Sequence, residues 1–397
     1  MVKKILIPLV IVVLASYLLQ SAYVHKNVAT FLWATSCFLL LAAIYLRRFR
    51  DVIIIVISIT ITLALVETGL GYLPKLLAKP DGESSKARST YFDSNQEYNT
   101  PAYWQLTQFG SQPRLGEFRA RKLASDGELI YDVNYSIGAD GFRLTPQFEG
   151  EPKRSFNFLG DSFTFGEGVQ DQETMAYFVG EESKRSGKKV TVKNFGMSGG
   201  GVHQALAILQ SNGAIDARTH FILTAPWHAS RAACADFFTL GSPKYVLGNS
   251  GEVIRDGYCR SFAWVEHSPK AVRGIITSSN IFKLIQDSLY VISDQDKQID
   301  LYLGILRTAA KEAKSRGETL VIGFMKADEK WFVGSYDNEK VLEKVQGIGV
   351  DVIDMTLVNR NEDLPKKYYL HDLDKHPTAA ANLERARLLS QHLKIHQ

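Results

Sequence analysis

The feature that most constrains the fold is the alternation of short apolar runs with amphipathic stretches after residue 150. The apolar runs are typical of buried strands, and the stretches between them have the apolar spacing of helices. The expected strands are 156–159, 189–195, 220–225, 320–324 and 351–355. The expected helices are 173–186, 202–210, 271–289, 296–315, 338–346 and one from Pro377 to Leu393. This order predicts an α/β fold, a mostly parallel, flavodoxin-like sheet with helices on both faces.

Right-handed crossovers place the carboxyl ends of parallel strands at one edge of the sheet, where such folds form their clefts. Four loops with glycine or reactive side chains follow these strands and are expected to converge there. They contain Ser162, residues 196–201, residues 226–231 and His376. Nucleophilic acyl transfer uses a serine together with a histidine and an acid, and these loops would supply all three.

Three apolar runs near the N-terminus, Ile5–Tyr23, Val28–Leu46 and Val52–Leu73, each approach the ~20 residues with which a helix crosses a bilayer. They predict three transmembrane helices. Basic residues stand before the first run and between the second and third: Lys3, Lys4, Arg47, Arg48 and Arg50. The positive-inside rule then predicts a multi-pass protein of the plasma (inner) membrane with an extracytoplasmic, periplasmic C-terminal domain. Glu67 lies toward the outer end of the third run, where an interfacial carboxylate is tolerated, and a buried functional acid is the alternative.

The net charge of +4 does not point to nucleic acid. Residues 1–79 carry a net charge of +6, which leaves −2 for the remainder of the chain. The basic excess therefore belongs to the membrane flanks, and no basic stripe with interleaved aromatics is present. The expected organisation is a membrane anchor over 1–74, a linker and β-rich preface over 75–150, and a catalytic domain over 151–397 with an inserted loop region at about 232–268.

The three cysteines offer one disulfide. Cys37 lies inside the second apolar run, whereas Cys234 and Cys259 both fall in the C-terminal region. In an extracytoplasmic domain these two could pair, and two free thiols are the alternative. No Cys/His spacing indicates a metal site, and residues 166–168 lack the third glycine of a dinucleotide loop. No metal or other cofactor is expected.

Three blocks of the sequence resemble the SGNH, or GDSL-type, hydrolase superfamily. They are Gly160-Asp161-Ser162-Phe163, Asn194-Phe195-Gly196-Met197-Ser198-Gly199 and Asp374-Lys375-His376-Pro377. The resemblance covers roughly residues 150–395. Together with an N-terminal anchor and a preface that ends in Gly141-Phe142-Arg143, the chain resembles membrane-attached bacterial members.

The resemblance implies a role for each matched residue. Ser162 would be the nucleophile, His376 the general base and acid, and Asp374 the acid that orients the histidine. The backbone amides of Ser162 and Gly199 would stabilise the oxyanion. The residues themselves support the same roles, because Ser162 follows a strand and Asp374 lies on the same loop as His376.

The sequence departs from the family pattern at two places. The third block usually supplies an asparagine to the oxyanion hole, whereas residues 225–231 contain none. His228 falls near that position and is the candidate donor, with a structural or substrate-binding role as the alternative. Arg231 could bind an anionic substrate group, although pairing with a carboxylate is the more ordinary role for it, and Asp161 is a further candidate for substrate binding. The usual acid precedes the histidine by three residues, where this chain has Leu373, so Asp372 competes with Asp374 for that role.

A second serine, Ser198, lies in a sequence close to the G-x-S-x-G elbow of α/β-hydrolases. In α/β-hydrolases several strands of the sheet come before the strand that leads into the elbow. Here only one expected strand comes before the strand that leads to Ser198. The elbow would also leave Gly160-Asp161-Ser162 without a role, so Ser162 is the preferred nucleophile.

These features predict a membrane-anchored extracytoplasmic serine esterase that acts through an acyl-enzyme, with acetyl esters of envelope or extracellular glycans as expected substrates. One alternative is an O-acyltransferase that modifies a surface polysaccharide at the same site, with an acyl-donor or polysaccharide-assembly partner. Another is a catalytically weak domain that binds glycan or scaffolds an assembly. A transporter is disfavoured by the few spans and the lack of internal symmetry.

Overall fold

The structure, a computed structural model, describes residues 28–45, 50–77, 104–124, 126–145, 154–187, 190–211, 218–236, 239, 241–259, 276, 279–290, 292, 294–326, 336–358 and 365–393. The chain divides into two compact units. The first combines Met1–Gly82 with Ser261–Leu289, and the second combines Glu83–Arg260 with Tyr290–Gln397. This division differs from the expected boundaries, because Ser261–Leu289 groups with the N-terminal helices.

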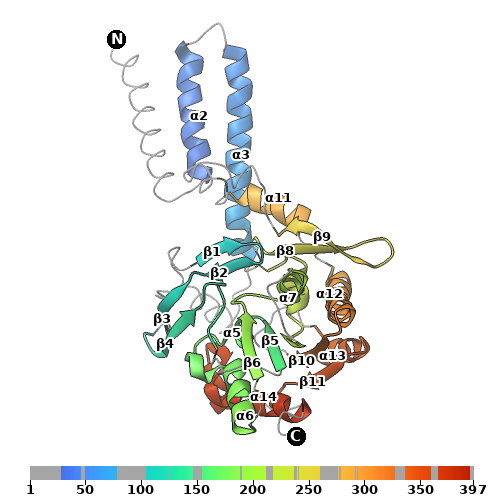
Figure 1. Ribbon diagram of the computed structural model, residues 1–397. Coiled ribbons are helices and arrows are strands. Elements are labelled where there is room, and N and C mark those ends of the chain that lie inside the picture. Colours follow the sequence, from blue (N-terminus) through green and yellow to red (C-terminus); the bar gives the residue numbers. More distant parts are fainter. Residues whose placement is uncertain are drawn as a thin grey trace. The chain divides into compact units, whose positions relative to one another are not determined.

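The second unit is built on a five-stranded sheet in the order β11-β10-β7-β5-β6 (Figure 1). Every pair in it is parallel. The strands are β5 (Arg154–Gly160), β6 (Val190–Gly196), β7 (Thr219–Thr224), β10 (Thr319–Phe324) and β11 (Asp351–Asp354). The expected α/β fold with a parallel sheet is thus confirmed, and all five expected strands form.

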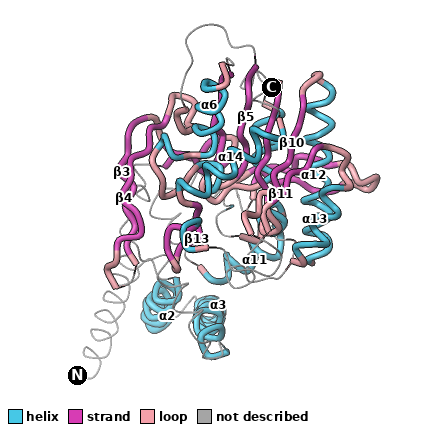
Figure 2. The backbone as a smooth tube through the Cα atoms, turned by 90° about the horizontal axis from the view of Figure 1, so that it is seen from below, coloured by secondary structure: helices cyan, strands magenta, loops and turns pink. Residues whose placement is uncertain are grey.

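Helices cover both faces of the sheet (Figure 2). On one face lie α7 (Val202–Gln210), α12 (Gln295–Ser315) and α13 (Asn338–Gln346), and on the other α6 (Met175–Arg185) and α14 (Ala379–His392). Alternate strand residues serve the two layers: Leu159 and Ile222 pack with the first group, and Phe158 and Phe221 with the second. A sheet buried on both faces requires such continuously apolar strands.

Four short hairpins surround this core. They pair β1 (Trp104–Thr107) with β2 (Gly110–Pro113), β3 (Gly116–Leu123) with β4 (Leu129–Ile137), β8 (Pro243–Leu247) with β9 (Val253–Tyr258), and β12 (Tyr369–His371) with β13 (Asp374–Pro377). The β3–β4 hairpin is the expected β-rich preface. Its inner face, with Tyr131 and Tyr135, packs against Phe165 and Leu370 from two loops beside the sheet.

The last helix begins later than expected. Pro377 ends β13, and Thr378 caps α14 by accepting a hydrogen bond from the Ala381 amide. The Cys234–Cys259 pair forms a disulfide with a Cα–Cα distance of 5.4 Å, so the disulfide alternative is the one that the structure contains.

The first unit contains α2 (Val28–Tyr45), α3 (Arg50–Leu77) and α11 (Asn280–Tyr290). Within the described residues, one helix is long and apolar enough to cross a membrane, Ile53–Tyr72, and Ala29–Leu39 is a shorter apolar helix. The expectation of three spanning helices is therefore not met: the third run qualifies by length and composition, the second falls short, and the first lies outside the described residues.

Glu67, on α3, does not lie open at a membrane surface. Its side chain is buried and accepts hydrogen bonds from the Ser279 hydroxyl (2.8 Å) and from the amides of Asn280 and Ile281. These amides belong to the first turn of α11 and have no partner within that helix. Glu67 thus caps a helix that the chain forms more than two hundred residues later.

Candidate active site

The serine lies in a tight turn at the carboxyl end of β5. A single helical turn, α5 (Ser162–Phe165), begins there because the Asp161 carboxylate accepts the Phe163 amide at 3.0 Å. The turn ends at Gly166, which adopts a left-handed φ of 83° that glycine tolerates best. Ser162 is thereby held at the edge where the strand ends.

The glycine loop after β6 packs directly against this turn. A side chain at Gly196 would place its Cβ 2.1 Å from the Phe165 amide nitrogen, so only glycine fits. The Met197 amide donates to the Gly160 carbonyl oxygen at 3.1 Å. The first and second sequence blocks are therefore neighbours, as their positions after β5 and β6 predict.

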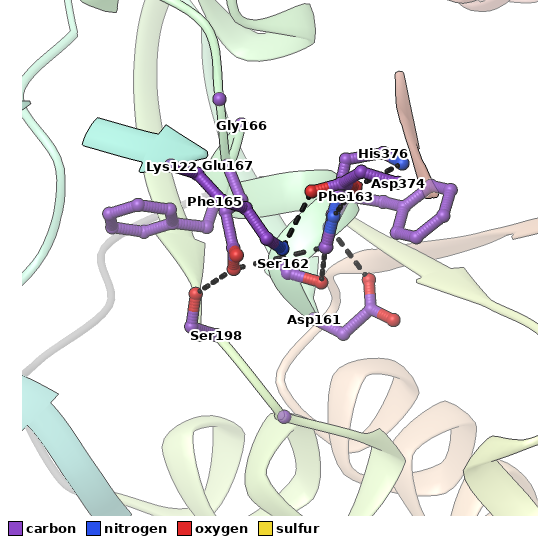
Figure 3. A network of polar contacts seen from close by, with 12 residues as sticks. Lys122, Asp161, Ser162, Phe163, Phe165, Gly166, Glu167, Ser198, Asp374 and His376 are labelled. Atoms are coloured by element: carbon purple, nitrogen blue, oxygen red, sulfur yellow. Dashed lines mark hydrogen bonds and ion pairs between the residues drawn. The ribbon is translucent and has the colours of Figure 1, made fainter. Parts of the chain in front are cut away.

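The β12–β13 hairpin brings the histidine to the serine (Figure 3). His376 Nε2 lies 2.8 Å from Ser162 Oγ, and His376 Nδ1 lies 2.5 Å from Asp374 Oδ1. Since an ionised carboxylate can only accept, Nδ1 carries the proton, and the neutral Nε2 accepts the serine hydroxyl proton. The three side chains form one hydrogen-bonded chain at the sheet edge.

The electrostatics of the pair follow from burial and charge. Burial opposes ionisation of Asp374, but the charges of His376 and Lys122 and their hydrogen bonds outweigh it and hold the pKa of Asp374 well below its usual range. Burial likewise acts to lower the pKa of His376, but the carboxylates of Asp374 and Glu167 outweigh it and raise that pKa. A raised pKa makes the imidazole a stronger base for the serine proton.

Asp372, the competing acid, lies elsewhere. Its carboxylate is largely exposed, accepts the Tyr369 hydroxyl at 2.8 Å and lies near Lys366 and Lys375. Asp374 is the carboxylate that contacts His376. The acid of this site therefore precedes the histidine by two residues.

Asp161 is the centre of a buried polar cluster behind the serine. One of its oxygens, Oδ2, accepts from Trp227 Nε1 (3.1 Å), His228 Nε2 (3.0 Å) and Arg231 Nη1 (3.1 Å). Burial opposes its ionisation, but His228 and Arg231 hold the pKa of Asp161 well below its usual range. Arg231 also donates to the Gly200 carbonyl oxygen at 2.6 Å. The cluster fixes the serine turn to two neighbouring loops.

This cluster decides between the alternatives for His228 and Arg231 and changes the role expected for Asp161. His228 does not serve as an oxyanion donor, because Nε2 bonds Asp161 and Nδ1 lies 3.0 Å from the Thr224 hydroxyl. Asp161 and Arg231 are both buried and bonded to each other, so neither faces a substrate. The positions of the motifs in the sequence do not show that His228 and Asp161 bind each other, because that contact forms only in the folded chain.

The oxyanion roles expected for the backbone amides of Ser162 and Gly199 stay predictions. The neighbouring Gly200 amide donates to the Met197 carbonyl oxygen at 2.8 Å. No cluster of three or more His, Cys, Asp or Glu that could hold a metal ion occurs among the described residues.

Two charged residues near the histidine were not anticipated. Lys122 Nζ, on β3, lies 2.7 Å from Asp374 Oδ2. Glu167 Oε2 lies 3.8 Å from His376 Nε2 and accepts the Ser198 hydroxyl at 2.6 Å. The alternative nucleophile Ser198 therefore donates to a carboxylate, while Ser162 is the serine that contacts the histidine. The strand alternation that places Lys122 on the same face as buried Ala120 was the available signal.

The fold and the arrangement of these side chains place the protein among α/β proteins with a Ser–His–Asp site. No protein-family model matches the chain, and neither does any curated protein sequence. Solved structures that the chain is similar to include a lipolytic protein of the G-D-S-L family from Desulfitobacterium hafniense (10% identity, TM-score 0.34). That match covers 60% of this chain and 99% of the other.

Two further matches carry esterase names. A catalytic mutant of the acetylxylan esterase Axe2 from Geobacillus stearothermophilus is 12% identical with a TM-score of 0.37, over 62% of this chain and 96% of that one. The psychrotrophic esterase EstA from Pseudoalteromonas is 10% identical with a TM-score of 0.34, over 61% and 97%. At this level of similarity the chemistry has to come from the chain's own residues.

Proposed function

We propose that this protein is an SGNH-type serine esterase that cleaves acyl esters through a covalent intermediate on Ser162. The observation that carries the proposal is the hydrogen-bonded chain from Ser162 Oγ through His376 to Asp374. Serine is a weak nucleophile unless an adjacent base removes its proton, and this chain supplies that base with its orienting acid.

The reaction follows from the geometry. Ser162 Oγ bonds to the ester carbonyl carbon as its proton passes to His376 Nε2. The carbonyl oxygen becomes an oxyanion that the amides of Ser162 and Gly199 can stabilise. The tetrahedral intermediate collapses, and the leaving alkoxide takes the proton from His376. A water molecule then attacks the acyl-enzyme by the same route, giving the acid and restoring Ser162.

The substrate class rests on the expected location. An esterase anchored by N-terminal helices, with its site outside the cytoplasm, meets acylated glycans of the envelope or the extracellular space. The apolar helix over residues 53–72 supports such an anchor. We therefore propose acetyl esters of glycans as substrates. An acceptor hydroxyl in place of water would make the same acyl-enzyme a transferase.

The test uses the full chain in detergent or nanodiscs. Wild-type protein is incubated with p-nitrophenyl acetate, acetylated xylan and acetylated chito-oligosaccharides, and the Ser162→Ala and Ser198→Ala variants are compared. We expect Ser162→Ala to lower kcat/KM by about 10⁴-fold or more and Ser198→Ala to keep most of the activity.

A fluorophosphonate probe reports on the nucleophile without a chosen substrate. Labelling of wild type and of Ser198→Ala at Ser162 supports the esterase. Absence of labelling in the folded wild type would instead favour a domain that only binds glycan. Acetyl transfer to an added glycan in preference to water would identify the acyltransferase alternative.

A further inference from the structure

A buried ion pair joins the β3–β4 hairpin to the acid of the site. Lys122 Nζ lies 2.7 Å from Asp374 Oδ2, and the two side chains are 2% and 0% exposed. The residues are 252 positions apart in the chain. Lysine is almost never buried this completely without a specific partner, because desolvating its charge is costly.

The two oxygens of Asp374 have separate tasks. Oδ1 accepts from the backbone amide of His376 at 3.0 Å and from its Nδ1 at 2.5 Å. Oδ2 accepts from Lys122. The carboxylate is therefore fixed from both sides, and its plane cannot rotate away from the imidazole without breaking the contact with Lys122.

The positive charge of Lys122 opposes the effect of the two carboxylates that stabilise the protonated form of His376. Asp374 and Glu167 face His376 and favour the imidazolium, whereas Lys122 favours the neutral ring. Other charged groups on these elements are engaged elsewhere, as the pairs His371–Glu128, Lys375–Asp372 and Arg231–Asp161 show. Lys122 is thus a cation that limits how far these carboxylates raise the pKa of His376.

We propose that Lys122 is a positioning residue of this site. It keeps Asp374 ionised and oriented toward Nδ1 of His376, and it extends to lower pH the range in which His376 is a neutral base. The proposal rests on the proposed function only for its effect on turnover, since the charge state of His376 can be measured without substrate.

The hairpin that carries Lys122 becomes part of the catalytic machinery. Its inner face packs on Phe165, beside the serine, and Leu370, beside the histidine strand. The Tyr135 hydroxyl accepts the amide of Gly168 at 2.7 Å. The catalytic unit therefore begins before residue 116, and a protein cut at residue 150 would lack a member of the site.

The experiment compares three variants of the full chain. Lys122→Met removes the charge at similar volume, Lys122→Gln removes it but keeps a donor for Asp374 Oδ2, and Arg119→Met removes the largely exposed Arg119–Asp132 pair of the same hairpin as a control. The titration of His376 is followed by NMR through its ring protons and its Nδ1 proton. The pH dependence of kcat/KM is measured in parallel.

We expect both Lys122 variants to hold a proton on the Asp374–His376 pair to higher pH, as one coupled titration. The ascending limb of kcat/KM then moves to higher pH, with roughly a tenfold loss near pH 6 and a smaller loss at alkaline pH. Arg119→Met is expected to titrate as wild type. Lys122→Gln keeps the test valid if Lys122→Met fails to fold.

An unchanged His376 titration in a folded Lys122→Gln protein would overturn the proposal and leave Lys122 a structural ion pair. A wild-type protein that titrates as described but turns over no ester would instead contradict the proposed function and leave the inference about charge standing.

Discussion

His376 lies between two carboxylates with different contacts. Asp374 hydrogen-bonds Nδ1, whereas Glu167 lies 3.8 Å from Nε2, on the side of the nucleophile. Glu167 is 6% exposed and is held by the Ser198 hydroxyl. It can stabilise the imidazolium that forms when the serine proton is transferred, and it will disfavour anionic substrates near the nucleophile.

Replacing Glu167 should shift the pH profile of kcat/KM in the direction opposite to the shift expected for the Lys122 variants. The charge of Glu167 raises the pKa of His376, so Glu167→Gln lowers that pKa and moves the ascending limb of kcat/KM to lower pH. The plateau is expected to fall by about tenfold or less, because the imidazolium loses one stabilising charge. The measurement is kcat/KM over the pH range with a neutral ester, and Ser198→Ala is the matched control. A limb that moves to higher pH would contradict this assignment.

The residues of the site differed in how far the sequence could predict them. Ser162, His376 and Asp374 stand in short motifs whose chemistry depends on residue type and order, so they could be singled out. The strand alternation around Lys122 indicated that its side chain is buried. Neither its role nor that of Glu167 could be predicted, because both roles arise from contacts across the fold with residues distant in sequence. For His228 the sequence left an oxyanion donor and a structural role open, since a ring nitrogen that could serve an oxyanion serves Asp161 equally well.

At the level of elements, Arg143 binds the segment that follows the serine turn. Its guanidinium, buried and 4.4 Å from the centre of the Tyr135 ring, donates to the carbonyl oxygens of Phe165 (3.1 Å), Gly166 (2.5 Å) and Val169 (2.6 Å). Phe165 ends the one-turn helix α5, and Gly166 and Val169 follow it. The Phe165 carbonyl also accepts from Asn194 Nδ2 at 3.4 Å, and the Gly166 carbonyl from the Val169 amide at 3.3 Å. Arg143 thus adds to the few hydrogen bonds that so short a helix supplies.

Arg143→Met should loosen this segment. We expect a loss of about 3 kcal/mol in the free energy of unfolding, since several buried carbonyls lose charged donors. Arg119→Met, which removes an exposed pair, should cost about 1 kcal/mol or less. Denaturant unfolding measures the difference, and fluorophosphonate labelling should slow in the first variant alone. Equal stability of the two variants would show that the carbonyls find other donors.

The elements of the sheet could be predicted from pattern, but the additions to it could not. All five strands and the helices α7 and α13 form where the apolar spacing places them. The start of α14 was wrong by two residues, because Pro377 pairs with Tyr369 in a hairpin before Thr378 caps the helix. A proline is compatible both with the first turn of a helix and with the end of an edge strand. Here the pairing of Pro377 with Tyr369 places it at the end of a strand.

For the whole molecule, the disulfide offers a test of compartment. Disulfides persist in oxidising surroundings, so the proposed extracytoplasmic location predicts that the Cys234–Cys259 bond is present in cells. We expect protein that is acid-trapped from cells and alkylated under denaturing conditions to take up label at Cys37 alone, and at all three cysteines after reduction. A Cys234→Ser and Cys259→Ser double variant serves as control. Uptake by all three without reductant would place the catalytic unit in a reducing compartment.

The division of the chain into two units has a consequence for how proteolysis could separate them. The chain passes between the units at three points, after residues 82, 260 and 289, because Ser261–Leu289 belongs with the N-terminal helices. A cut at the first junction alone leaves the second unit joined to the first through Ser261–Leu289. Separating the two units would take cuts at all three junctions, and two of these lie within the stretch of chain that builds the second unit itself.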